Sequence, residues 1–168
     1  MRTSPLRHGF DHHVWATLTL IDACAILTPD QLASPVPGIY GGVLDTMRHI
    51  VGADASYLHR LTHGRVPRIE EETMDLAQLR AEMDGHEPQW HGVIDADPDP
   101  DETIVATYED GSETHAVVGI RLAQALHHGT DHRSQICTAL TTMGFEPPEI
   151  DVWDFGVVAG SVHEVEPG

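Results

Sequence analysis

The chain has 168 residues, about the length of one domain, and its 40% hydrophobic and 21% charged content is ordinary for a folded globular protein. Nine basic residues, all arginine, stand against 27 acidic ones, which gives a net charge of −18. Nucleic acids and anionic membranes attract basic surfaces, so this charge predicts neither as a partner and favours a small molecule or a metal ion. The unusual feature of the composition is its 13 histidines.

The two cysteines and the apolar stretches suggest a cellular compartment. Cys24 and Cys137 are far apart in the sequence, so they fit neither a disulfide framework nor a thiolate zinc site, and we interpret both as reduced, buried residues. Residues 1–5 lack the apolar stretch of a signal peptide, and the most apolar run, 14–27, is too short to span a bilayer. We therefore expect a cytoplasmic protein.

The first half of the chain predicts two long helices and one short one. Residues 9–27 carry apolar side chains three and four apart, which is typical of an amphipathic helix. Thr28 and Gln31 have the spacing of a capping box at the start of a short helix, which the prolines within 34–38 end. The same apolar spacing predicts a long helix over residues 40–63.

A third long helix is predicted over residues 71–94. Gly85 and Pro88 interrupt its apolar stripe, so we expect a kink or a break there. Two β-rich runs follow at 103–108 and 113–118, and the Asp-Gly pair between them predicts a short hairpin.

A fourth long helix is predicted over residues 119–143. The segment around Trp153 and Phe155 is expected to fold back over the end of the helices, and 156–168 to form a C-terminal tail that is loosest at its end. Together the elements predict one all-α domain over residues 1–168, an antiparallel four-helix bundle with a small β-hairpin before the last helix. Such bundles often hold metal ions between facing helices.

Two histidines give the fourth helix its clearest functional signal. Steps of three and four residues carry the apolar stripe through His128 and His132, so both should point into the core, one turn apart. Burying imidazoles without partners is unfavourable, and a divalent metal would use both as ligands. The alternative is a pair of core or surface histidines satisfied by hydrogen bonds.

A third ligand would come from another helix. His49 is the leading candidate, because the small residues Gly52 and Ala53 leave room beside it one turn further on. The rival on the same helix is the pair His59 and His63, which lies at the helix end, where a solvated face is the favoured interpretation.

Four further residues are candidates for supporting roles. His127 has the spacing to hydrogen-bond Asp131, or to orient a ligand from behind. Arg133, beside the paired histidines, would hold an anionic substrate group or form a surface salt bridge. Asp45, one turn before the third candidate ligand, would reach the mouth of the site or be solvated, and we favour solvation. Spacing places no general base, so no catalytic residue is assigned.

Several stretches of the chain resemble the DinB-like superfamily. Residues 126–135 (LHHGTDHRSQ) resemble the signature of its fourth helix, and residues 47–53 resemble its second-helix histidine segment. Residues 144–153 resemble the stretch after the last long helix, and Trp15 fits the first helix. The resemblance covers nearly the whole chain in the right order.

This resemblance implies a four-helix bundle in an up-down-down-up arrangement with one divalent metal ion, zinc or nickel first and iron(II) or manganese(II) as alternatives. Carried over by position, the ligands are His49, His128 and His132. Asp131 replaces a histidine that is common in relatives, at a position off the metal-facing stripe. Ser134 stands where the ergothioneine-pathway sulfoxide synthases have a glutamate, so that activity is not expected.

Three protein ligands leave open positions on a metal, which is typical of catalytic sites. The resemblance implies thiol-dependent transferases and isomerases that use low-molecular-weight thiols such as mycothiol, bacillithiol or glutathione, and it also implies a homodimer. We place thiol transfer before metal-dependent hydrolysis, because spacing positions no base for a metal-bound water. A non-enzymatic metal-binding protein of the stress response is the third hypothesis.

Overall fold

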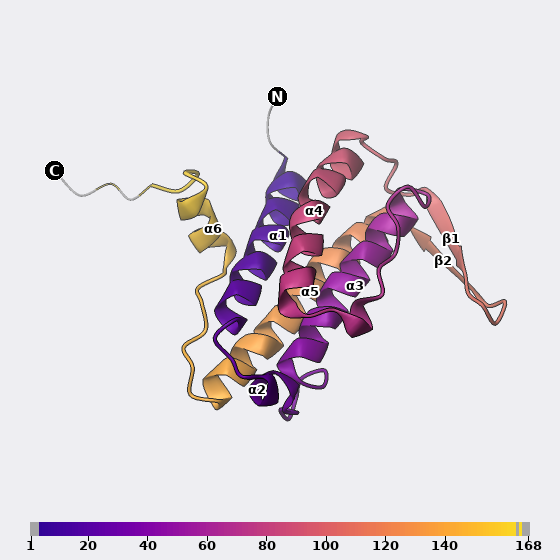
Figure 1. Ribbon diagram of the computed structural model, residues 1–168. Helices are drawn as coiled ribbons and strands as arrows, with labels where there is room; N and C mark the ends of the chain where they lie inside the picture. Colours follow the sequence, from indigo (N-terminus) through magenta and orange to yellow (C-terminus); the bar gives the residue numbers. More distant parts are fainter. Residues whose placement is uncertain (1–3, 164, 166–168) are drawn as a thin grey trace.

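The computed structural model describes residues 4–163 and 165, and these form a mostly helical molecule with one two-stranded antiparallel sheet (Figure 1). The long helices are α1 (Pro5–Cys24), α3 (Val43–Leu61), α4 (Leu76–Asp95) and α5 (Val118–Thr142). The short elements are α2 (Pro29–Ala33), the 3-10 helix η1 (Glu71–Thr73), β1 (Thr103–Thr107), β2 (Glu113–Val117) and α6 (Val152–Val158). The predicted helical class, with a hairpin before the last long helix, is confirmed.

The four long helices enclose one apolar core. Helices α1 and α3 each pack against both α4 and α5. Phe10 of α1 and Trp90 of α4 stack with ring centroids 4.1 Å apart, which adds about 0.5–1.5 kcal/mol to the gain from burial. Eight buried positions of these helices are polar or charged instead, and four of them form one network: His13, Asp54, His86 and Arg133.

Side-chain caps set where several helices begin. The predicted capping box of α2 is present, because Thr28 and Gln31 each accept a hydrogen bond from the other's backbone N–H. Asp75 accepts from the backbone N–H of Gln78 in the same way, so α4 begins at Leu76 rather than at 71. The residues expected to form its first turn are instead η1.

Helix α4 continues through Gly85 and Pro88, so the predicted interruption does not break it. Pro88 removes one helical N–H, which is normally costly. The residues on either side of it, His86 and Trp90, are both buried and both donate hydrogen bonds to Asp54 of α3. These anchors hold the backbone helical across the proline.

The C-terminal segment returns along α1 (Figure 1). His12 is bonded through Nε2 to the carbonyl oxygen of Ile150 at 2.8 Å, and the rings of Trp15 and Phe155 lie 5.5 Å apart. The side chain of Asp151 caps α6, so helix occupies the start of the stretch expected as a tail from 156. Residues 164 and 166–168 of that tail lie outside the described part. None of the described helices combines the length and apolarity needed to cross a membrane.

The hairpin packs at the end of the molecule where α3 ends and α5 begins. Strands β1 and β2 pair from Thr103 with Val117 to Thr107 with Glu113, and β2 leads directly into α5. Gly111 has φ 80° in the predicted Asp-Gly turn, a conformation that suits glycine. Strand β1 contacts α3, and β2 contacts α5.

Candidate metal centre

Three histidines from α3 and α5 come together between these helices. One ring-nitrogen donor from each of His49, His128 and His132 lies within 4.8 Å of the donors of the other two. The Nε2 atoms of His49 and His128 are 3.0 Å apart, and the ring centroids of His128 and His132 are 4.5 Å apart. All three side chains are half-buried. The structure therefore brings together the histidines that the sequence singled out.

This donor set fits a divalent cation. Zinc–imidazole bonds of about 2.0–2.1 Å place neighbouring ligand nitrogens roughly 3–3.4 Å apart, depending on the geometry. The 3.0 Å separation between the Nε2 atoms of His49 and His128 is at the short end of that range. Imidazole suits zinc, nickel, copper and iron. Among the described residues, no Cys, Asp or Glu belongs to this group, so open coordination positions would remain.

Two further residues orient the histidines, and the sequence interpretation missed both. Nδ1 of His132 lies 2.9 Å from Oε1 of Gln135, which fixes the ring and turns Nε2 toward the cluster. Tyr40 stacks on the ring of His49 with centroids 4.2 Å apart and an angle of 17°. Gln135 was detectable one turn after His132, whereas Tyr40 precedes the helix and gave no periodic signal.

The electrostatics of the cluster favour neutral imidazoles. Burial, followed by the proximity of His132 and His49, lowers the pKa of His128 to about 4. Burial and His132 also lower the pKa of His49. Neutral imidazole is the form that binds a metal, so these rings present lone pairs near neutral pH.

A sequence model of the DinB family matches residues 1–162, nearly the whole chain. The chain belongs to the DinB family. The resemblance predicted from the sequence is thereby confirmed. Comparison with curated proteins gives no match.

The other candidate residues of this DinB-family protein lie away from the cluster. Asp45 is exposed, pairs with Arg48 and accepts a hydrogen bond from the backbone at the start of α3. His127 and Asp131 are exposed on α5. The rival His59 of α3 bonds through Nδ1 to the carbonyl oxygen of Val66, in the loop that follows the helix, at 2.9 Å.

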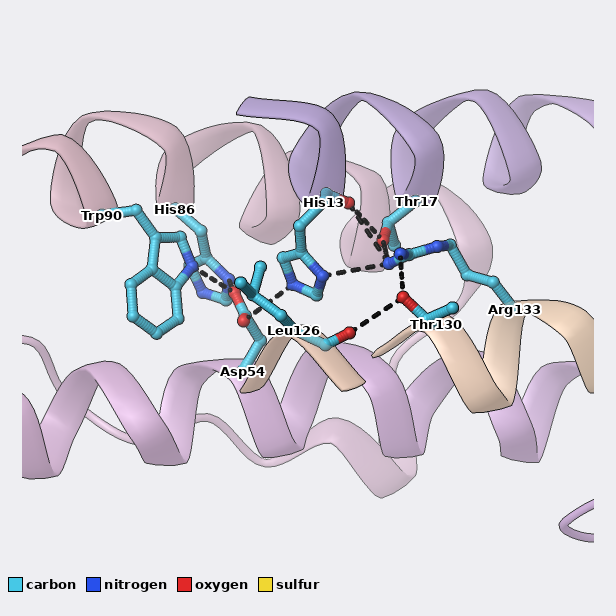
Figure 2. A network of polar contacts seen from close by, with 8 residues as sticks. All are labelled: His13, Thr17, Asp54, His86, Trp90, Leu126, Thr130 and Arg133. Carbon is cyan, nitrogen blue, oxygen red and sulfur yellow. Dashed lines mark hydrogen bonds and ion pairs between the residues drawn. The ribbon is translucent and has the colours of Figure 1, made fainter. Parts of the chain in front are cut away.

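Arg133 differs from the expectation of a surface salt bridge. Its side chain is buried, it forms no surface salt bridge within the described residues, and it does not join the histidine cluster. The position is one residue past His132, which turns it about 100° round the helix, toward α1. There its guanidinium donates to Nδ1 of His13 at 3.0 Å, Oγ1 of Thr17 at 3.1 Å and Oγ1 of Thr130 at 3.2 Å (Figure 2).

A buried carboxylate anchors the same network. Asp54 of α3 is 2% exposed and accepts from Nε2 of His13 at 3.0 Å, Nδ1 of His86 at 2.7 Å and Nε1 of Trp90 at 3.0 Å (Figure 2). Burial alone would raise the pKa of Asp54, but the two histidines outweigh it, and the pKa is well below its usual range. The core therefore holds an ionised carboxylate with its donors in place.

His13 joins the two halves of this network. Its Nε2–H donates to Asp54 while its Nδ1 accepts from Arg133, so the bonds specify one neutral tautomer. Gly129 makes the approach possible, since a Cβ at that position would lie 2.4 Å from Cε1 of His13. Gly129 and Arg133 face α1 on the same turns of α5 that carry His128 and His132 toward α3. The Asp54 network thus fixes the segment that presents two of the cluster histidines.

Two other features of the structure, a cavity and a second group of ligand-type residues, are separate from the histidine cluster. A cavity of 760 Å³ lies between α1, α5 and residues 149–154, but none of the three cluster histidines lines it. Asp11, Glu87 and His91 form a second group of ligand types at the surface. His91 already bonds Asp11 at 2.7 Å, and Arg7 lies 3.9 Å from the same carboxylate, so Asp11 already has two partners.

The cysteines take no part in the cluster. Burial raises the pKa of Cys24 to about 12, so this thiol stays protonated and unreactive at neutral pH. Both cysteines are unpaired; Cys24 is buried, whereas Cys137 is only partly buried, less than the sequence predicted. A reacting sulfur would therefore come from a diffusible molecule.

Proposed function

We propose that this DinB-family protein is a divalent-metal-dependent enzyme that uses a low-molecular-weight thiol to transfer or isomerise a small substrate. One observation carries the proposal: His49, His128 and His132 converge with their donor atoms within 4.8 Å of one another and with no carboxylate or thiolate in the group. Three neutral donors with open positions are typical of a catalytic centre.

The residues in and around the histidine cluster suit thiol chemistry better than hydrolysis. A zinc or nickel ion held by the three histidines would lower the pKa of a coordinated thiol or water. Hydrolysis further needs a base or acid beside the reacting water, and the candidate carboxylates Asp45 and Asp131 are exposed and outside the cluster. Thiol transfer needs the thiolate sulfur to bond the electrophilic carbon while the leaving group departs with its electron pair. The chain's part is then to hold and orient both reactants.

The test is an assay of zinc- and nickel-loaded protein with mycothiol, bacillithiol or glutathione and a generic aryl halide as the electrophile. We expect metal-dependent loss of free thiol in the wild-type protein and in His59→Ala, and its absence in His132→Ala. A parallel panel of ester, amide and lactone substrates tests hydrolysis. Metal-dependent hydrolysis without thiol turnover would contradict the proposal, and metal binding without either activity would favour a non-enzymatic protein.

The finer description of the protein rests on its family. We propose that the four long helices form the antiparallel bundle in the up-down-down-up arrangement, and that the protein acts in the cytoplasm on a small molecule as a homodimer. Light scattering at tens of micromolar tests the last point, with a dimer mass expected and a monomer mass contradicting it.

A further inference from the structure

Two arginines at the hairpin end of the α3–α5 interface lack acidic partners. Of the eight arginines that the structure describes, three pair with a carboxylate and five do not. Arg7, Arg48 and Arg80 each pair with one. Within the part of the chain that the structure describes, neither Arg60 of α3 nor Arg121 of α5 forms an ion pair.

Their guanidinium groups are also incompletely hydrogen-bonded. The Nε atoms of Arg60 and Arg121 are both buried without a partner among the described residues. Arg121 is only 7% exposed and donates from Nη2 to the carbonyl oxygen of Ile104 at 2.9 Å, while Arg60 donates from Nη1 to the carbonyl oxygen and hydroxyl of Ser56. A buried N–H group without an acceptor is costly. Within the described residues, the two Nε–H groups therefore lack acceptors, and the two guanidinium groups lack a carboxylate partner.

The two arginines lie at the same end of the packed helices α3 and α5, since Arg60 is in the last turn of α3 and Arg121 is in the first turn of α5. After burial, the charge of Arg60 is the next largest cause that lowers the pKa of Arg121. The phenol of Tyr108 in the hairpin lies beside both. A hydrogen bond to Thr114, the charge of Arg60 together with a hydrogen bond from it, and the charge of Arg121 lower the pKa of Tyr108 against the effect of desolvation. Tyr108 is 44% exposed, so the cluster reaches the surface at the hairpin. Two adjacent cations without an anion form a site that a bound anion would complete.

The arginine pair lies on the same interface as the three histidines. Helices α3 and α5 run antiparallel (Figure 1), so the end of α3 that carries Arg60 lies beside the start of α5 that carries Arg121. On α5, Arg121 precedes His128 by two turns, about 10 Å along the axis. Tyr57 lies between them, with its ring 6.2 Å from the ring of His128 and close enough to Arg121 to affect its pKa.

We infer that Arg60 and Arg121 form an anion subsite that holds a carboxylate of the molecule whose reacting end lies at the histidine cluster. This inference rests on the proposed function and narrows its substrate class. The guanidinium fork matches a carboxylate in two parallel hydrogen bonds. The substrate pair therefore includes a carboxylate about 10 Å from the reacting atom, on the thiol or on the electrophile, and an uncharged thiol with an uncharged electrophile is disfavoured.

The first experiment titrates zinc-loaded protein with succinate and follows the arginine Nε–H signals by NMR. We expect saturable shifts at Arg60 and Arg121 and none at Arg65, an exposed arginine nearby that donates only to the carbonyl oxygen of Thr62. Arg60→Gln should raise the dissociation constant about tenfold, and Arg65→Gln should leave it unchanged. Arg121→Lys keeps the charge but loses the fork, and should weaken binding with little loss of stability. Absent or unsaturable binding, or equal effects of Arg60→Gln and Arg65→Gln, would overturn the inference.

The second experiment finds which reactant carries the carboxylate and separates this inference from the proposed function. Glutathione and its dimethyl ester are titrated into the wild-type protein and Arg60→Gln. Tighter binding of the acid, lost in Arg60→Gln, assigns the carboxylate to the thiol; equal binding together with saturable succinate binding assigns it to the electrophile. His132→Ala should keep succinate binding while losing thiol binding, so failure of the thiol chemistry would not be mistaken for failure of the anion subsite.

Discussion

Two groups of histidines lie between the long helices, on sides of α5 that are about 100° apart, and they differ in what surrounds them. On the α1 side of α5, His13 and His86 share the buried carboxylate of Asp54, and Arg133 completes the network. On the α3 side, the rings of the cluster face one another and have no carboxylate among them. The first group is electrostatically complete and stabilises the fold. The second group consists of three close imidazoles, and we propose that they hold a divalent cation.

The two groups are also connected through helix α5. Gly129 and Arg133 tie α5 to His13, and His128 and His132 lie on the same turns. Metal ligands are oriented best on a rigid backbone, so we propose that the Asp54 network supports the histidine cluster.

The largest expected effect comes from breaking the complete network. Asp54→Ala leaves three buried donors without an acceptor and should cost about 3–5 kcal/mol of unfolding free energy in metal-free protein. His49→Ala removes a member of the histidine cluster and should change stability by less than about 1 kcal/mol. Urea denaturation of both variants measures the difference, and equal losses would mean that the two groups do not differ as described.

Metal addition should stabilise the protein through the histidine cluster alone. Zinc at about 100 times its dissociation constant is expected to add about 2.7 kcal/mol, because it binds the folded state. Thermal unfolding with and without zinc measures this gain. The gain should persist in His59→Ala and vanish in His132→Ala; a gain that survives in His132→Ala would show that zinc binds elsewhere.

A larger residue at Gly129, where α5 packs against His13, should have an intermediate effect on stability. Gly129→Ala places a Cβ 2.4 Å from His13 and 2.9 Å from Nη1 of Arg133, and should cost about 1–3 kcal/mol. The matched control is Gly85→Ala in α4, where nothing lies within 4 Å and helix propensity predicts a gain of about 0.5–1 kcal/mol. Chemical denaturation of both checks the signs, and a neutral Gly129→Ala would refute the close packing.

The smallest effect is a difference in pH dependence. The pKa of His128 is lowered to about 4, so between pH 6.5 and 4 the unfolded chain binds more protons there than the folded one, and stability falls as pH falls. Asp54, with its lowered pKa, contributes stability that is lost only below about pH 4. Metal-free His128→Ala should therefore show a shallower decline between pH 6.5 and 4 than the wild-type protein. An unchanged slope would contradict this assignment.

The sequence predicted the cluster better than the network because periodicity reports which face a residue occupies. His128 and His132 continue an apolar stripe, and their type and spacing suggest a ligand pair. Asp54 fills the gap between Val51 and Leu58 in the stripe of α3, and this was the available signal for a buried carboxylate. What spacing within one helix does not reveal is the partner on another helix.

Other differences have local causes. The start of α4 depends on the Asp75 cap, which an acidic run just before it obscures. The continuity of α4 through Pro88 depends on His86 and Trp90 being anchored to α3, a tertiary effect that overrides local propensity. The orientation of Arg133 follows from its 100° offset from His132 together with the position of α1, which only the assembled fold supplies.

The most direct test of the account is the metal content of protein purified without added metal. The wild-type chain and His59→Ala are predicted to hold one divalent ion per chain, and His49→Ala, His128→Ala and His132→Ala to hold little or none while remaining folded by circular dichroism. Elemental analysis by mass spectrometry gives the stoichiometry. A full complement of metal in His132→Ala, together with its loss in His59→Ala, would contradict the claim that the α3–α5 histidines form the metal centre.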